Sequence, residues 1–259
     1  DLLPVAAQDV ISAAEYSIRQ LATPVVMSGL EMLQNNGRER MIDLMEGRLS
    51  VAESTMTNTL ADGVYSDGTA DGGKEIEGLD AAVPIDPSTG TYGGIDRSAF
   101  GFWSSGIFAS FGIVGAATSA ANIQEQMNAA WSALVRGSDR PDLIPMDSIF
   151  WQFYVASLQS IQRFTGTEVG KLGFPTIKYM DADCVLDGGI GGFCPASTMF
   201  MLNTKYIFLR PHRDRNMVAL MPSKRYAINQ DAEVQILGWA GNLTTSGSQF
   251  QGRLISTAS

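Results

Sequence analysis

His212, the only histidine of the chain, is the first residue to consider for acid–base chemistry. It lies in the polar stretch 210–216, which also holds three arginines. A histidine–aspartate pair with a distant serine is the pattern of a hydrolase, but the sequence contains no Gly-x-Ser-x-Gly nucleophile elbow. The pattern favours a solvated or interface loop, with a hydrolase as the remote alternative.

Three aspartates, Asp181, Asp183 and Asp187, are spaced like the start of a calcium-binding loop. Val185 occupies the position where that loop needs another oxygen ligand, so the pattern favours acids of a strand and turn. The glycines within 188–192 match neither a dinucleotide-binding fingerprint nor a Walker loop, and they predict a tight turn instead. We therefore expect no catalytic site, no metal and no cofactor.

The two cysteines, Cys184 and Cys194, lie ten residues apart. Together with a single histidine they are too few for a four-ligand zinc site. A disulfide between them is geometrically possible, but we expect two free thiols, which are typical of a reducing compartment.

The charges of the chain are unevenly distributed. Residues 1–90 hold 15 acidic and 5 basic side chains, a local charge of −10, whereas residues 91–259 hold 12 acidic and 13 basic ones, a charge of +1. The net charge of −9 excludes a protein that generally coats nucleic acid. A late basic cluster could bind phosphate, but the charge distribution favours contact with an acidic surface of another copy. Its members are Lys205, Arg210, Arg213, Arg215, Lys224 and Arg225.

The composition points to an oligomer. The 259 residues are 45% hydrophobic and only 17% charged, against about 25% charged in a typical soluble domain. A chain of this length buries a substantial core without disulfides or metals. Low charge on a soluble chain suggests that much of its surface faces other protein.

One uncharged run, between Ser98 and Ile123, requires a comparison with membrane segments. It is long enough to span a bilayer, but repeated glycine and serine lower its hydropathy and no basic flank sets an orientation. We expect buried strand and loop here. A membrane-active protein that uses residues 99–115 is an alternative from a different functional class.

The strongest periodic signal predicts a long helix over residues 36–62. Apolar residues step by three or four along one face, Asn36 is placed to cap the helix, and Gly63 is placed to end it. The stripe consists of Met41, Met45, Leu49, Ala52, Met56 and Leu60.

Shorter patterns surround this helix. Alternation from Ala14 to Arg19 predicts a strand, and the residues after Pro24 suggest an edge strand. Two more helices are expected, over about 119–136 and after Asp147, with strands near 141–146, 174–187, 198–210 and at the end of the chain. Helices and strands mix without a βαβ repeat, so the predicted fold class is α+β.

A series of short motifs in a fixed order resembles the major capsid proteins of tailed bacteriophages, which have the Hong Kong 97-like fold. The resemblance extends over nearly the whole chain. The motifs are SGLEMLQNNG at 28–37, GTYGGIDR at 90–97, LVRG at 134–137, RPDLI at 140–144, SLQSIQR at 157–163, FMLNTKY at 200–206, VQILGWAGNL at 234–243 and QGRL at 251–254.

The resemblance implies a domain organisation. Residues 1–28 would be part of the E-loop hairpin, residues 29–117 and 223–259 the peripheral domain with its spine helix at 36–62, and residues 118–222 the axial domain. An N-terminal arm and the first E-loop strand would precede Asp1.

The resemblance also implies a function. The chain would be a structural, non-enzymatic subunit that assembles into hexamers and pentamers of an icosahedral head, made in the bacterial host cytoplasm and found in the virion. It would enclose DNA without sequence-specific binding and without a membrane. Portal, scaffold and decoration proteins would be its other partners. An encapsulin-like cellular compartment shell with the same fold is the nearest alternative.

We expect the contacts between subunits in two segments of the chain. The N-terminal candidates would lie on a neighbouring subunit and meet opposite charges there, and the later candidates belong to the basic cluster. They are Glu15, Tyr16, Ile18 and Arg19, and Arg210, Arg213 and Arg215.

Overall fold

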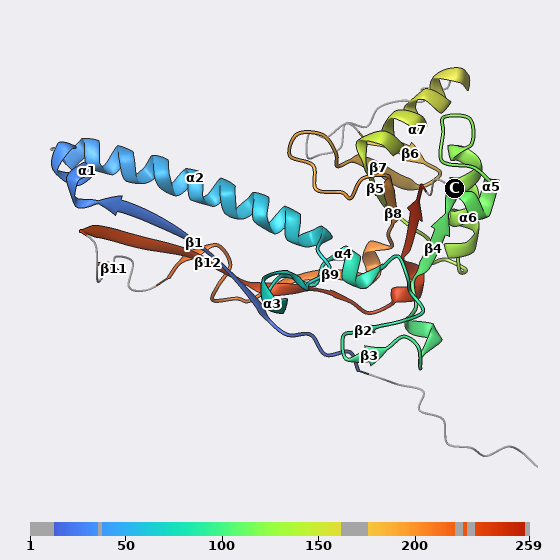
Figure 1. The fold of residues 1–259 in the computed structure, drawn as a ribbon, viewed down its shortest axis with the longest axis horizontal. Coiled ribbons are helices and arrows are strands. Elements are labelled where there is room, and N and C mark those ends of the chain that lie inside the picture. The colour runs from blue at the N-terminus through green and yellow to red at the C-terminus, as the bar shows by residue number, and fades with distance from the viewer. Residues whose placement is uncertain (1–12, 36–37, 162–175, 221–224, 227–230, 257–259) are drawn as a thin grey trace, which may run out of the picture.

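The fold is described from a computed structural model, which covers residues 13–35, 38–161, 176–220, 225–226 and 231–256. The molecule is elongated (Figure 1), with a long helix and a long sheet at one end and a second sheet with shorter helices at the other. Helices and strands alternate irregularly along the chain, which confirms the predicted mixture of both.

The long helix predicted over 36–62 is present as α2, Arg38–Tyr65. Its 28 residues span about 42 Å. Met56 is fully buried, which confirms the apolar stripe in the second half of the helix. The prediction that Gly63 ends the helix is wrong, because the helix continues until Tyr65 has entered the core. The predicted cap Asn36 lies outside the described residues, as do the side chains of Met41 and Met45.

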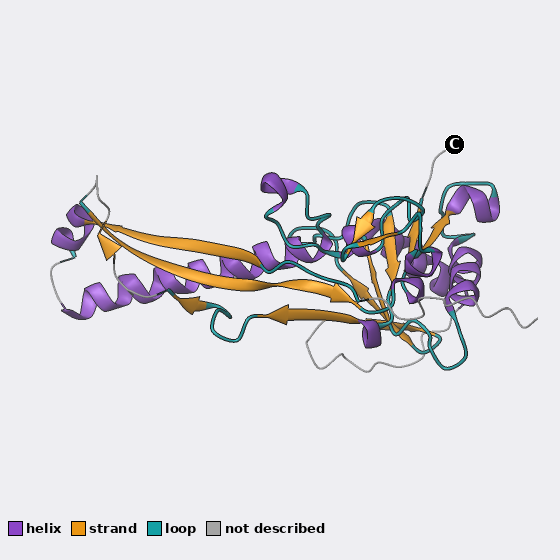
Figure 2. Cartoon of the chain, turned by 90° about the horizontal axis from the view of Figure 1, so that it is seen from below, coloured by secondary structure: helices purple, strands orange, loops and turns teal. Residues whose placement is uncertain are grey.

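A five-stranded sheet lies along α2 (Figure 2), with β12, Ala232–Thr245, as its central strand. The strand β1, Arg19–Ser28, pairs with β12 in antiparallel register over ten residues. Its position at an edge of the sheet fits the expectation from Pro24, because proline cannot donate a hydrogen bond to a second neighbour. The predicted strand Ala14–Arg19 is wrong, since the strand begins only at Arg19. Three shorter strands also pair with β12, namely β9, Ile207–Pro211, β10, Val218–Ala219, and β11, Arg225–Tyr226.

A six-stranded sheet has the order β4-β13-β8-β5-β7-β6. The strands are β4, Gly106–Ala109, β5, Leu143–Met146, β6, Thr176–Tyr179, β7, Ala182–Leu186, β8, Thr198–Met201, and β13, Gly252–Ile255.

Two helices accompany this sheet. The helix α6, Ile123–Leu134, buries Ile123, Met127, Trp131 and Leu134 as its periodicity predicted. The helix α7, Ser148–Ile161, starts as predicted after Asp147, whose Oδ1 accepts a hydrogen bond of 2.6 Å from the Ser148 amide.

The remaining elements are short. They are α1, Gly29–Gln34, α3, Ala70–Gly73, α4, Leu79–Ala82, α5, Ser110–Val114, the strands β2, Thr91–Tyr92, and β3, Ile95–Asp96, and the 3-10 helices Gly101–Trp103, Thr204–Tyr206 and Ser248–Phe250. Ser28 caps α1 in a capping box with Glu31.

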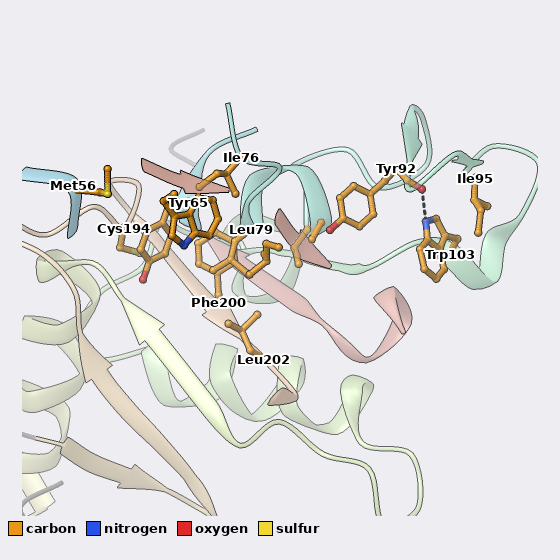
Figure 3. Close-up of a cluster of buried hydrophobic side chains, with 14 of the residues drawn as sticks. Met56, Tyr65, Ile76, Leu79, Tyr92, Ile95, Trp103, Cys194, Phe200 and Leu202 are labelled. Atoms are coloured by element: carbon orange, nitrogen blue, oxygen red, sulfur yellow. Dashed lines mark hydrogen bonds between the residues drawn. The ribbon is translucent and has the colours of Figure 1, made fainter. Parts of the chain in front are cut away.

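Two clusters of buried apolar side chains form the core. The first joins the end of α2 to α4, β8 and β12, and Figure 3 shows Met56, Tyr65, Leu79 and Phe200 within it. The second lies between α6, α7 and the six-stranded sheet. Aromatic residues extend the first cluster, where the Trp103 indole N–H donates a 2.9 Å hydrogen bond to the Tyr92 carbonyl.

The residues that belong to each of the two sheets do not follow the predicted domain boundaries. The strands β4 and β13 belong to the six-stranded sheet, although the prediction assigned both to the peripheral domain. Conversely, β9 and β10 pair with β12 in the long sheet, although residues 118–222 were assigned to the axial domain. Strand pairing between distant segments, which local sequence patterns do not contain, sets this division.

The uncharged run 99–115 folds into a 3-10 helix, the strand β4 and the short helix α5. Its middle is the expected strand, β4, which pairs with β13 at an edge of the six-stranded sheet. The expected burial is only partial, because the residues of β4 are half-buried and Phe102 and Phe111 are exposed. In the part of the chain that the structure describes, no helix combines the length and hydropathy needed to cross a membrane.

Candidate assembly surface

A hollow of about 710 Å³ brings together residues from both predicted contact segments. Tyr16 and Arg210, which are 194 positions apart, line it with the aromatic side chains of Phe102, Phe208 and Phe250. Tyrosine, tryptophan and arginine are enriched in the residues that dominate binding at protein interfaces. The hollow therefore has the composition of a protein-binding surface, and we call it the aromatic hollow.

The strand β12 explains why the two segments meet. Gly241 of β12 is paired with Arg19 of β1 on one side and with Pro211 of β9 on the other. A Cβ atom at Gly241 would lie 2.6 Å from the Arg210 carbonyl oxygen, so only glycine allows this close approach of β9.

Tyr16 is fixed within its own chain. Its hydroxyl donates a 2.9 Å hydrogen bond to the Thr245 carbonyl, and its ring packs edge-on against Tyr92 with 5.3 Å between ring centroids. Gly93 has a φ of +57°, and a Cβ there would lie 2.9 Å from the Tyr16 ring. Burial raises the pKa of the Tyr16 hydroxyl. Tyr16 therefore lines the hollow with an uncharged side chain that is held in one orientation.

The expectation that Arg19 meets an opposite charge on a neighbouring subunit needs correction. Arg19 Nη2 lies 2.6 Å from Glu77 Oε1 in the same chain, and Arg19 Nη1 donates to the Gly73 carbonyl. Glu15 and Ile18 differ from Arg19 because both side chains are exposed. These two residues remain candidates for contact with a neighbour.

The three arginines are exposed near the end of β9. The Arg210 guanidinium lies over the Phe208 ring, 5.2 Å from its centroid, and Arg210 Nε donates to Thr244 Oγ1 at 3.1 Å. Arg215 Nη1 donates to Gln20 Oε1 at 3.4 Å. Stacking on an aromatic ring holds the Arg210 guanidinium in one orientation. No local sequence pattern indicates that Phe102, Phe208 and Phe250 belong to this surface, because their shared position depends on the tertiary fold.

The residues with candidate catalytic or metal chemistry lie apart from the aromatic hollow. His212 is exposed, and its Nδ1 accepts a 3.2 Å hydrogen bond from the Asp214 amide. Asp181 forms an ion pair with Arg140 at 2.8 Å. Among the described residues, no group of histidine, cysteine, aspartate or glutamate side chains is arranged to hold a metal ion.

Cys184 and Cys194 are free, buried thiols, as the sequence analysis expected. Burial raises the pKa of each thiol to about 12. We expect both thiols to resist alkylation at pH 8 in the folded subunit and to react after unfolding, with mass spectrometry under non-reducing conditions as the measurement. A bridged 184–194 peptide would contradict this prediction.

The raised thiol pKa values also predict a pH dependence of stability. Folding holds both thiols neutral, so this contribution is complete below the pKa of an exposed thiol, about 8.5. It declines as the pH rises from there towards about 12.

Comparison with known proteins gives a result only at the level of structure. No protein-family model matches the sequence, and no curated protein matches it. The capsid of cyanophage A-1(L) matches with a TM-score of 0.61 and 15% identity, over 93% of this chain and 78% of the phage chain. The chain has the fold of phage major capsid proteins. The capsid fold was the expectation from the sequence motifs, and it is confirmed.

Other structures with the capsid fold extend this result. The capsid protein of an empty GTA particle matches with a TM-score of 0.60 and 14% identity, over 98% of this chain and 80% of the other. The SrpI encapsulin from Synechococcus elongatus also matches, with a TM-score of 0.50 and 9% identity, over 93% of this chain and 74% of the other. The match to the capsid fold thus extends over nearly the whole chain.

Proposed function

We propose that this protein is the structural major capsid protein of a tailed phage, which assembles into a closed icosahedral shell around double-stranded DNA. The observation that carries the proposal is the match of 93–98% of the chain to capsid proteins of phage and GTA particles. The low charge of the chain supports it, because lateral surfaces between subunits are depleted in charged residues.

The two sheets support a division into the parts that the family resemblance implies. The helix α2 serves as the spine helix, and the long sheet around β12 belongs to the peripheral domain. The six-stranded sheet with α6 and α7 forms the axial domain, which gains β4 and β13 relative to the prediction from sequence. The resemblance assigned residues 1–28 to the E-loop, but β1 pairs with β12 over residues 19–28, so we assign β1 to the peripheral domain and only the residues before it to the E-loop.

The main partners of the subunit are other copies of the same chain, with which it forms the hexamers and pentamers of the proposed shell. The acidic first third of one copy and the more basic remainder of another favour head-to-tail contacts, which close into rings. Because the chain is acidic, the shell encloses DNA without sequence-specific binding. Portal, scaffold and decoration proteins are further proposed partners, in a particle assembled in the bacterial host cytoplasm.

An encapsulin-like compartment shell is the second candidate function, and the structural match to the SrpI encapsulin supports it. The contents of the particle distinguish the two functions. A phage head contains nuclease-protected double-stranded DNA, whereas a compartment shell contains protein cargo.

The proposed function predicts closed particles of uniform size. The full-length protein, expressed with its scaffold where one is encoded beside it, is purified and imaged by negative-stain electron microscopy. Shells of one diameter are the expected result. A protein that stays monomeric at micromolar concentration under these conditions would refute the proposal.

Reversal of the charge at Arg210 tests the aromatic hollow as a contact surface. We expect Arg210→Glu to reduce the yield of shells at least tenfold, because a carboxylate over the Phe208 ring loses the cation–π contact and opposes an acidic partner. Light scattering measures assembly, and circular dichroism should show an unchanged fold because Arg210 is exposed.

The matched control is Arg136→Glu, which makes the same charge change at another exposed arginine outside the hollow. Arg136→Glu should assemble nearly as the unmodified protein does. Equal loss of assembly in both variants would show that net charge, and not the aromatic hollow, controls the yield.

A further inference from the structure

The loop between β7 and β8 displays one isoleucine at its tip. Ile190 has a relative exposure of 111%, the highest among the large apolar side chains that the structure describes, ahead of Leu33 at 72%. Two glycines precede it and two follow it. The side chain therefore contacts almost nothing in its own subunit.

The loop around Ile190 has a defined shape that its glycines make possible. Gly189 and Gly191 have φ values of +82° and +89°, which favour glycine. A Cβ at Gly188 would lie 2.5 Å from the Ser148 amide nitrogen, and one at Gly192 would lie 2.4 Å from the Gly188 Cα. All four glycines thus have a role in the fold of this loop, whereas Ile190 has none.

Both ends of the loop are attached to the core. The Asp187 amide donates to the Met146 carbonyl at 3.0 Å, and the Phe193 amide donates to Asp187 Oδ1 at 3.3 Å. Phe193 packs against the first core cluster, and the next residue, Cys194, is buried within it. The tip is therefore presented by an anchored frame, which lowers the entropic cost of using it in a contact.

The chemistry of the loop restricts what covers Ile190. Residues 187–193 contain no lysine or arginine, and the carboxylate of Asp187 accepts from the chain itself, so the loop carries no positive charge that would attract the phosphates of DNA. A single aliphatic side chain without a basic neighbour also gives little affinity for a lipid surface. The surface that best fits Ile190 is therefore an uncharged, apolar surface of a protein.

The same chain offers such a surface. A groove of about 420 Å³ between β1 and α2 is lined by Val26 and Val51, both exposed. Among the described residues that line it, the one charged side chain is Arg48, which is already paired with Glu31 at 2.6 Å. A projection and a groove on different elements of one chain are the parts of a head-to-tail interface, which repeats from copy to copy.

We propose that Ile190 is an inter-subunit contact residue, whose side chain packs into an apolar surface of a second copy of this chain. The inference rests on the proposed shell function and adds a specific contact to it. The glycines on both sides of Ile190 let the tip reach into the neighbour without backbone strain.

Substitution of Ile190 tests the proposal. Ile190→Ser should raise the protein concentration needed for assembly by about ten- to a hundredfold, the loss expected for one buried aliphatic side chain. Ile190→Leu keeps the apolar volume and should assemble within about threefold of the unmodified protein. Both variants should melt at the same temperature as the unmodified subunit, because Ile190 contributes nothing to its core.

A photo-crosslinking amino acid at position 190 identifies the partner. Shells are assembled from a mixture of ¹⁴N and ¹⁵N chains, irradiated and digested, and crosslinked peptides are read by mass spectrometry. Peptide pairs of mixed isotope composition are the expected result. Crosslinks confined to one chain, to lipid or to another protein would overturn the proposal, as would unchanged assembly of Ile190→Ser.

The experiments distinguish failure of the Ile190 contact from failure of the proposed shell function. If unmodified protein forms shells while Ile190→Ser assembles equally well, the contact is refuted and the shell function stands. If unmodified protein forms no shells, the proposed function itself is refuted.

Discussion

Replacement of Met56 by aspartate is expected to prevent the subunit from folding in soluble form. Met56 has 0% exposure on the inner face of α2, close to Tyr65 and Cys194 in the first core cluster (Figure 3). A carboxylate at this position would be buried without a partner, at a cost of several kcal/mol. That cost is a large part of the total stability of a domain, about 5–15 kcal/mol. The soluble fraction after expression measures the effect.

Two matched variants on the same helix control this experiment. Met56→Leu preserves the apolar volume and should cost less than about 1.5 kcal/mol. Glu53→Gln changes an exposed side chain and should leave the melting temperature nearly unchanged. A soluble Met56→Asp subunit with native circular dichroism would show that the buried face of α2 is assigned incorrectly. Met45 belongs to the same predicted stripe, but its side chain lies outside the described residues.

Replacement of Arg253 by alanine should destabilise the subunit by about 3–5 kcal/mol. Arg253 of β13 is only 4% exposed, and its Nη1 lies 2.7 Å from Asp80 Oδ1 of α4. The guanidinium also lies over the Phe200 ring, 5.0 Å from the centroid. The ion pair thus connects α4, in the first core cluster, to the six-stranded sheet. Urea unfolding of unassembled subunits at one fixed concentration measures the loss.

The loss should depend on pH in a definite direction. Burial raises the pKa of the Asp80 carboxyl, and the Arg253 charge opposes this rise. Without Arg253 the pKa of Asp80 rises further, so the carboxyl becomes neutral at a higher pH. The destabilisation by Arg253→Ala should therefore be smaller at pH 5 than at pH 7.

An exposed ion pair provides the matched control for Arg253. Arg140 lies 2.8 Å from Asp181, with both side chains more than half exposed. Arg140→Ala should cost at most about 1 kcal/mol at either pH. Equal effects of the two arginine substitutions would contradict a structural role for the Asp80–Arg253 pair.

Local sequence patterns predicted the three long helices α2, α6 and α7, but not the short helices α1, α3, α4 and α5. The stripes of α2 and α6 repeat every three or four residues, and burial of Met56, Ile123 and Met127 agrees with them. The helix ends were less well predicted, because tertiary packing of Tyr65 extends α2 past Gly63. A helix satisfies its backbone hydrogen bonds within one segment, so its signal is contained in that segment.

The strand boundaries and the contact surface depend on pairing between distant parts of the chain. Residues 14–19 alternate as a strand does, yet the strand begins at Arg19, where pairing with β12 becomes available. Arg19 finds its opposite charge in Glu77 of its own chain. Tyr16 and Arg210 line the same hollow because β12 pairs with both β1 and β9.

Sequence patterns were sufficient to predict the α+β class, the long helix and two free thiols, and the ordered motifs predicted the capsid fold. The tertiary structure decided the sheet division, the aromatic hollow and the exposure of Ile190. The physical reason is the range of the interactions. Helix periodicity is local, whereas a strand is completed by a partner about 200 residues away, and that partner fixes which side chains are buried and which reach the surface.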